Sequence, residues 1–264
     1  MKLLNLVTML CLYSGLIFAK AEIITIEGIK EAAAIISKST AEQDLLIFDI
    51  HNLILMQKSN LLRPCGQAML DDFFKRYASD PSKKWEMEKA ILHERDELPV
   101  NTETIELINK LILNKQNLIF LSSYPIEKHS LDPNIEAYRF NQLLDSGIML
   151  HDSVFNRRYN MENIKEKSYA FYNNIVFCEN DSKGLAFDGV IEQSKCRPRH
   201  VYFIDDRLKN LQHVMQICVR LGIDFTGFYY PYAQSIPCHL DYEIASKQLE
   251  ELATSSKWHE EDRV

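Results

Sequence analysis

Three acidic residues follow two apolar segments of this chain and could together bind a metal ion. Asp49 follows the apolar run 45–48, and Asp205 and Asp206 follow the apolar run 201–204. Four apolar residues in a row are typical of a strand that is buried on both faces, as in a parallel sheet. Acids at the carboxyl ends of such strands lie where open α/β sheets bind ligands, and carboxylate oxygens suit Mg²⁺ beside a phosphate. Alternatively, each acid only caps the helix that follows it.

A serine pair and a lysine lie between the two acidic segments. Ser122 and Ser123 follow the apolar run 118–121, and Lys183 lies at the start of a predicted helix. A phosphoryl group carries its charge on peripheral oxygens, so a metal ion, an ammonium group and a hydroxyl donor bind it well. Taken singly, a serine after a strand usually caps a helix and a lysine at a helix start is usually solvated. Their combination with the acids makes all three candidate substrate-binding residues.

The apolar pattern also predicts the elements that would position these residues. Short apolar runs predict strands at about 23–26, 45–48, 118–121, 175–178, 201–204 and 225–229. Helical spacing is found at about 29–37, 102–113, 134–146, 182–191 and 208–221. Strands that alternate with helices of crossover length favour a doubly wound parallel sheet, so the predicted fold class is α/β.

The stretch at about 60–99 is longer than a single crossover needs. Helical spacing at 67–77 and 83–98 is punctuated by prolines. We expect a small, mostly helical cap insertion over the carboxyl ends of the strands, and a peripheral decoration is the alternative. A last amphipathic helix with a charged, solvated face is predicted at 242–254.

The N-terminus differs from the rest of the chain. Lys2 precedes an apolar stretch over residues 3–19, and Ala19-Lys20-Ala21 has the small-x-small pattern of a cleavage site. This pattern predicts a signal peptide over residues 1–21, and an uncleaved membrane anchor is the alternative. We therefore expect an exported protein, periplasmic or secreted, with a mature domain over 22–264 that is not attached to a membrane.

Composition narrows the range of partners. The chain has 264 residues, of which 46% are hydrophobic and 25% charged, as in globular proteins. Its formal net charge of −7 becomes −9 after cleavage, because Lys2 and Lys20 are removed. An acidic chain without a basic tract is a poor candidate for nucleic-acid binding. We therefore expect no nucleic-acid partner, and the acids, serines and lysine described above favour a small phosphorylated substrate instead.

Five cysteines remain after the predicted cleavage, at positions 65, 178, 196, 218 and 238. None of them forms a CxxC pair, so neither a zinc site nor a thioredoxin-like motif is predicted. An odd number leaves at least one thiol free or paired between chains. Cys178 and Cys218 lie within apolar runs and are expected in the core.

In chain order, the polar landmarks resemble the motif order of the haloacid dehalogenase-like (HAD-like) phosphohydrolase superfamily. The resemblance covers about residues 44–230. The segments 203–211, Phe-Ile-Asp-Asp-Arg-Leu-Lys-Asn-Leu, and 221–225, Leu-Gly-Ile-Asp-Phe, are similar to a group of exported bacterial HAD-like proteins catalogued only as a domain of unknown function. A response-regulator receiver also combines Asp, Ser or Thr and Lys on a parallel sheet. Its acidic pair comes at the first strand and its lysine at the last, which is not the order here.

The resemblance implies a role for each landmark residue. Asp49 matches the nucleophile that attacks phosphorus and becomes an aspartyl-phosphate. Ser122 matches the hydroxyl that holds a phosphoryl oxygen, and Lys183 matches the cation that pairs with the nucleophile and the phosphate. Asp205 matches a Mg²⁺ ligand, and Asp206 a second ligand or a group that orients the ligands. The implied activity is a Mg²⁺-dependent phosphatase that acts on a small phosphomonoester.

The chain departs from the family pattern at the first motif, where Asp-x-Asp-x-Thr is usual. His51 replaces the aspartate that protonates the leaving group and later activates water, and Leu53 replaces the threonine. Metal binding can survive, because the family uses the backbone carbonyl of the second position, which His51 also supplies. Either the His51 imidazole takes over acid/base catalysis, since its unperturbed pKa is about 6.5, or the chain is a catalytically inactive binding or interaction protein.

Overall fold

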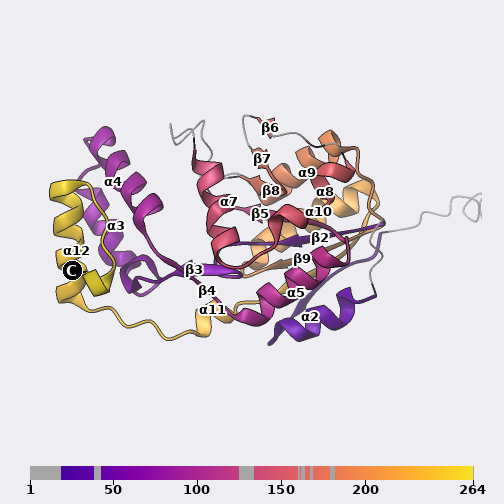
Figure 1. The fold of residues 1–264 in the computed structure, drawn as a ribbon, viewed down its shortest axis with the longest axis horizontal. Coiled ribbons are helices and arrows are strands. Elements are labelled where there is room, and N and C mark those ends of the chain that lie inside the picture. Colours follow the sequence, from indigo (N-terminus) through magenta and orange to yellow (C-terminus); the bar gives the residue numbers. More distant parts are fainter. Residues whose placement is uncertain are drawn as a thin grey trace, which may run out of the picture.

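An eight-stranded, mostly parallel sheet lies at the centre of the computed structural model, which describes residues 19–38, 43–124, 134–159, 161, 164–166, 169–178 and 182–263 (Figure 1). In spatial order the strands are β1 (Ala21–Thr25), β10 (Asp224–Tyr229), β9 (His200–Asp205), β2 (Asp44–Phe48), β5 (Asn117–Ser122), β8 (Ile175–Phe177), β7 (Ala170–Tyr172) and β6 (Ile164–Lys165). Neighbours from β1 to β8 pair in parallel, whereas β7 and β6 are antiparallel. The predicted α/β class with a mostly parallel sheet is confirmed. The antiparallel edge was not predicted.

Helices cover both faces of this sheet. One face carries α2 (Ile29–Ile36), α5 (Thr102–Leu113) and α7 (Ile135–Asp145), and the other carries α8 (Phe155–Arg158), α9 (Lys183–Ser194) and α10 (Leu208–Leu221). Leu46 and Phe48 of β2 pack toward the first layer, and Leu45 and Ile47 toward the second. A strand covered on both faces needs an apolar residue at every position, which explains the continuous run 45–48.

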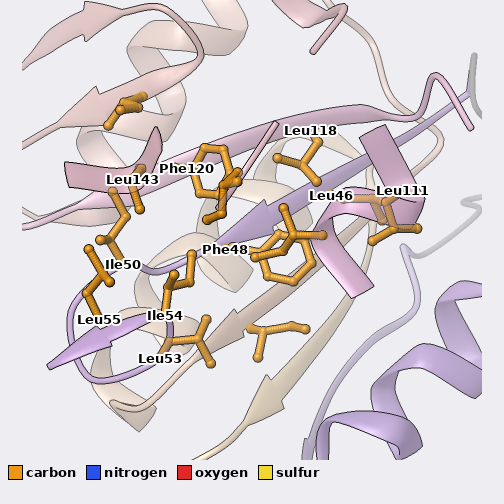
Figure 2. Close-up of a cluster of buried hydrophobic side chains, with 14 of the residues drawn as sticks. Leu46, Phe48, Ile50, Leu53, Ile54, Leu55, Leu111, Leu118, Phe120 and Leu143 are labelled. Atoms are coloured by element: carbon orange, nitrogen blue, oxygen red, sulfur yellow. The ribbon is translucent and has the colours of Figure 1, made fainter. Parts of the chain in front are cut away.

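Figure 2 shows the core on the face covered by α5 and α7. The ring centroids of Phe48 in β2 and Phe120 in β5 lie 6.5 Å apart, and Leu111 of α5 packs in the same cluster. Leu53, from the loop after β2, is fully buried in this cluster. The loop that follows β2 is thereby anchored in the core.

A helical lobe, residues 58–96 together with 238–263, lies beyond the carboxyl ends of the central strands (Figure 1). It contains α3 (Gln67–Lys75), α4 (Pro81–Glu94), α12 (Tyr242–Ser255) and the short 3₁₀ helices η1 (Asn60–Leu62) and η3 (Glu261–Arg263). Its own apolar core joins the two segments, with Phe73 and Met87 from the first and Leu249 and Trp258 from the second. An antiparallel ribbon of β3 (Leu55–Gln57) and β4 (Glu97–Pro99) connects the lobe to the sheet.

The lobe differs from the predicted insertion in two respects. The helix predicted over 83–98 ends at Glu94, because Glu97–Pro99 pair with β3 instead. The predicted C-terminal helix is confirmed as α12, but it belongs to the lobe, because its apolar face completes the core of the lobe. The segment at about 60–99 therefore supplies only part of this lobe.

A disulfide between Cys65 and Cys238 joins the two segments of the helical lobe. Cys178, Cys196 and Cys218 are free and buried. The expectation that Cys178 and Cys218 are core residues is confirmed. Two further short helices are α11 (Tyr232–Ser235) and η2 (Leu150–Asp152).

The predicted signal peptide lies almost entirely outside the described residues, which begin at residue 19. The predicted cleavage point before Glu22 falls at the start of β1, where Ala21 is in register with Phe225 of β10. Within the described part of the chain, no helix is both long enough and apolar enough to cross a membrane.

Candidate functional site

The acidic residues meet between β2 and β9, where the order of the strands in the sheet changes from one side to the other. From β2 the chain continues through β5 toward β8 on one side, whereas from β9 it continues to β10 on the other. The loops diverge at such a point and leave a crevice at the carboxyl ends of the strands. Asp49 follows β2, and its N–H donates to the carbonyl of Ile204 in β9 at 3.0 Å. Asp205 ends β9 and Asp206 follows it.

Three carboxylates converge in this crevice. Oxygens of Asp49, Asp205 and Asp206 lie within 4.8 Å of one another, and all three side chains are buried. Burial, together with repulsion from Asp49, raises the pKa of Asp205 to about 7 and that of Asp206 to about 6. Buried carboxylates at this separation repel one another unless cations compensate them. The cluster can therefore hold a metal ion.

Lys183 supplies one of these cations. It is the first residue of α9, whose N-terminus is capped by the Ser182 side chain, which accepts a hydrogen bond from Gly184 N at 3.2 Å. The Lys183 Nζ lies 2.6 Å from Asp49 Oδ1 and 2.8 Å from Asp205 Oδ2. Burial alone would lower the pKa of Lys183, but the two carboxylates outweigh burial and raise it. Lys183 is therefore a fixed positive charge between two strands.

Two further groups orient Asp205. The backbone N–H of Arg207 donates to Asp205 Oδ1 at 2.8 Å, and Asn210 Nδ2 donates to both carboxylate oxygens at 3.0 and 3.1 Å. In Asp49, Oδ1 accepts from the Ile50 N–H at 2.7 Å in addition to Lys183. No hydrogen bond to Asp49 Oδ2 is formed by the residues that the structure describes. Within the described part of the chain, this oxygen therefore has no protein donor.

A tight loop after β2 carries His51. The N–H of Asn52 donates to Leu55 O at 2.7 Å, and that of Ile54 donates to Ile50 O at 3.0 Å. Asn52 has a positive φ of 61°, in the left-handed region that asparagine tolerates, and its side chain bonds Asp206. Leu53 lies in the apolar core rather than at the acids, so it does not take part in the site.

His51 is a neutral imidazole in this arrangement. The Gln57 amide nitrogen lies 3.1 Å from its Nε2 and 3.3 Å from its Nδ1. An amide N–H can donate only to an unprotonated ring nitrogen. The loss of hydration at this position and the nearby Arg95 guanidinium together lower the pKa of His51 to about 4, although the Glu97 carboxylate acts in the opposite direction.

A cleft of about 540 Å³ lies over these groups, between the sheet and the helical lobe. The predicted site residues that line it are Asp49, His51, Ser122, Ser123 and Asp206. Lys183 and Asp205 do not line the cleft, but Lys183 contacts Asp49 directly. The structure thus brings all seven predicted residues to one place.

The two serines reach the cleft because β5 pairs with β2. Ser122 is the last residue of β5, is buried, and accepts a backbone hydrogen bond from Cys178 N at 3.0 Å. Ser123 is exposed. The opposite wall comes from the helical lobe and is largely apolar, with Leu62, Leu70, Phe74, Trp85, Ile91 and Leu92. A polar floor under an apolar wall is typical of small-ligand sites.

Several polar residues of the cleft were missed by sequence reasoning. Asn210 and Arg207 lie within the segment 203–211, but no spacing rule indicates that they orient Asp205. Gln57, Arg95 and Tyr124 also line the cleft. The β3–β4 ribbon and the end of β5 bring these three residues together, and no local pattern signals that contact.

A family model described as "Protein of unknown function (DUF2608)" matches residues 25–259. No curated protein and no solved structure gave a significant match. The matched range includes every strand of the sheet except most of β1, the acidic cluster, and also α12 of the helical lobe. Because the match spans most of the chain, this protein belongs to the DUF2608 family.

Proposed function

We propose that this chain is a metal-dependent phosphohydrolase with a HAD-like, doubly wound core, in which Asp49 is the nucleophile. The observation that carries the proposal is the Lys183 ammonium between Asp49 and Asp205 at the ends of two neighbouring strands. The chain order of these residues, with Ser122 before Lys183, is the order that the HAD-like resemblance implies. The size of the cleft supports a small phosphomonoester as the substrate.

Mg²⁺ is the proposed cofactor, and the donor set fits it. Three ionised carboxylates and one ammonium leave two net negative charges, which a divalent cation neutralises. Oxygen ligands of this kind are those that Mg²⁺ prefers. Asp49, Asp205 and the backbone carbonyl of His51 are the proposed ligands, with Asp206 as a further ligand or an orienting group. When bound, the ion would neutralise charge that develops on the phosphoryl oxygens.

The proposed first step uses the oxygen of Asp49 that has no protein donor. Attack by Oδ2 on phosphorus would form a bond to Asp49 and break the bond between phosphorus and the leaving oxygen. Lys183 and Ser122, with Ser123 beside it, would hold the phosphoryl oxygens. Water would then hydrolyse the aspartyl-phosphate, which releases inorganic phosphate and restores Asp49.

His51 is proposed to act in the second step alone. A neutral imidazole can take a proton from the attacking water, but it has no acidic proton ready for the leaving group. The bond from Gln57 supports this assignment, because it requires an unprotonated ring nitrogen. Substrates whose leaving group needs little protonation are therefore favoured.

Export is also proposed, to a periplasm or out of the cell. The apolar N-terminal stretch supports it, and so does the Cys65–Cys238 disulfide, because disulfides persist mainly in oxidising compartments. The acidic net charge supports a mature protein that binds neither nucleic acid nor membrane.

Trapping of the covalent intermediate tests the function. Radiolabelled acetyl phosphate and Mg²⁺ should label the wild-type chain in an acid-stable, hydroxylamine-sensitive form. Asp49→Asn should not be labelled, because an amide cannot form the acyl phosphate. Asp188→Asn is a matched control, since Asp188 forms an ion pair with Arg220 at the surface. Equal absence of label from wild type and Asp49→Asn would contradict the proposal.

One observation favours a second candidate function. His51 and Leu53 replace two of the three polar residues of the first motif, and Leu53 is buried away from the acids. A binding protein that holds a metal and a phosphorylated ligand without turnover would keep the remaining residues. It would bind propylphosphonate in the presence of Mg²⁺ and yet release no phosphate from any phosphomonoester at acidic or neutral pH.

A further inference from the structure

Beside the acidic cluster lies a second charged group that the proposed reaction does not use. Arg95 follows α4, Glu97 lies in β4, Tyr124 follows β5, and Arg139 lies in α7. Arg95 Nη2 lies 2.8 Å from Glu97 Oε1, and Arg139 Nη1 bonds Glu97 Oε2. Both guanidinium groups lie over the Tyr124 ring, 5.9 Å from its centroid for Arg95 and 4.8 Å for Arg139.

This group carries one more positive than negative charge. Burial alone would raise the pKa of Glu97, but Arg139 and Arg95 outweigh it and hold that pKa at about 2. Glu97 is therefore ionised, and arginine is always protonated in proteins. A buried cation without a full counter-charge is unfavourable, so the group attracts an anion.

The same residues have unpaired donors. Among the described residues, no hydrogen-bond partner is found for Arg95 Nε, for Arg139 Nε and Nη2, or for the Tyr124 hydroxyl. The Tyr124 side chain is 4% exposed and Arg139 is 0% exposed. Buried polar groups are rarely left without a partner. Arg95 and Tyr124 line the cleft, so an acceptor that enters the cleft meets these two residues.

We propose that Arg95 and Tyr124, with the charge of the buried Arg139, form an anion-binding subsite for a second oxyanion of the substrate. The guanidinium fork binds carboxylate and phosphate alike. The subsite lies in the same cleft as Asp49, so both anionic groups belong to one small molecule. The substrate class is then a phosphorylated carboxylic acid or a bisphosphate, which rests on the proposed function for the reacting phosphoryl group.

The subsite can be tested without the reaction. In EDTA the three carboxylates repel anions from the metal site, so inorganic phosphate should bind at Arg95. Calorimetric titration should show this binding in wild type, and Arg95→Met should weaken it by about tenfold or more, as for a lost charge-assisted hydrogen bond. Tyr124→Phe removes one unpaired hydroxyl, so it should fold normally and bind phosphate more weakly.

Arg76→Met is the matched control, because Arg76 is exposed in the same lobe and does not line this cleft. It should bind phosphate as wild type does. No phosphate binding in EDTA, or equal binding by wild type, Arg95→Met and Tyr124→Phe, would overturn the subsite and leave water as the partner of these donors.

The substrate class is tested with three non-hydrolysable probes and Mg²⁺. Propylphosphonate carries one anionic group, and 3-phosphonopropionate and propane-1,3-bisphosphonate carry a second at the other end. At least one of the two probes with a second anionic group should bind about tenfold more tightly than propylphosphonate. Arg95→Met should abolish this difference and leave the affinity for propylphosphonate unchanged. Which of the two binds more tightly identifies a carboxylate or a phosphate. Equal affinity for all three would overturn the inference.

Phosphate binding in EDTA without Mg²⁺-dependent propylphosphonate binding would instead overturn the proposed function and leave the subsite in place.

Discussion

The ammonium nitrogen of Lys183 lies 2.6 Å from Oδ1 of Asp49, and both side chains are buried beneath the cleft. The same nitrogen lies 2.8 Å from Oδ2 of Asp205, so one cation balances carboxylates from two strands. The ion pairs therefore couple the start of α9 to the ends of β2 and β9. The same contacts that would hold a phosphoryl group also hold the fold together.

Lys183→Met should strongly destabilise the metal-free protein. It leaves buried carboxylates without their cation, and breaking a buried ion pair in this way typically costs about 3–5 kcal/mol. Urea denaturation in EDTA measures the free energy of unfolding. Lys247→Met is the control, because its pair with Glu243 is solvent-exposed and should contribute less than about 1 kcal/mol. Equal stability of the two variants would show that the acids are compensated in another way.

Asp206→Asn should weaken Mg²⁺ binding about tenfold or more, because one of the three negative charges of the acidic cluster is removed. His51→Ala should bind Mg²⁺ as wild type does, because the backbone carbonyl at position 51 is retained. Titration calorimetry in phosphate-free buffer checks both variants. Loss of binding in a folded His51→Ala protein would rule out the carbonyl as a ligand.

The metal-free protein should lose stability as the pH rises from about 4 to about 7. In the folded state the pKa values of Asp205 and Asp206 are about 7 and about 6, above their ordinary value of 3.8. Across this window the folded chain holds protons that the unfolded chain has released, so the free energy of unfolding falls with pH.

Urea denaturation in EDTA at several pH values tests this dependence. Asp206→Asn should show a shallower decline than wild type, and saturating Mg²⁺ should reverse the decline in wild type. If wild type and Asp206→Asn differed by the same amount at every pH, the raised pKa of Asp206 would be wrong.

Wild type should hydrolyse aryl phosphates faster than alkyl phosphates, because a nitrophenolate leaves without a proton. His51→Asp supplies an acid at this position and should reduce that preference by increasing turnover of the alkyl ester. His51→Ala should slow hydrolysis of the aspartyl-phosphate by about 10²–10⁴, the usual effect of a lost acid/base group. Single-turnover kinetics with both ester types measures each step. A His51→Asp variant with an unchanged preference would exclude leaving-group protonation as the limiting factor.

Removal of the Cys65–Cys238 disulfide should loosen the helical lobe more than the sheet. The bridge joins residues 173 positions apart, and cross-links over long loops typically contribute about 2–4 kcal/mol. In the double alanine variant, backbone hydrogen exchange should accelerate in α3 and α12 and stay unchanged in β2 and β9. Equal acceleration in all four elements would mean that the lobe and the sheet unfold as one unit.

The acidic cluster could be predicted from local sequence. Asp49 and Asp205 each follow an apolar run, and such runs identify strands buried on both faces. Parallel strands end at a common edge, so the residues that follow them meet there. Lys183 follows Ser182, which caps the N-terminus of α9. Its position at the start of a helix could also be predicted from local sequence.

Other features had no local signal. The apolar face of α12 predicts a buried side but does not say which surface covers it, and that surface is formed by α3 and α4. The partner of Cys65 among the cysteines is likewise not encoded in the spacing. Both depend on contacts between segments that are far apart in the chain.

By itself, the sequence determined the strands of the parallel part of the sheet, the helices that flank them, the acids at the strand ends and the presence of His51 two residues after Asp49. These follow from side-chain periodicity and residue type, which are local properties. Only the tertiary structure decided that Gln57 bonds His51, that Leu53 is withdrawn into the core, and that Arg95 and Tyr124 line the cleft of Asp49. These depend on how the lobe packs against the sheet, because protonation and anion binding respond to whichever groups the fold places nearby.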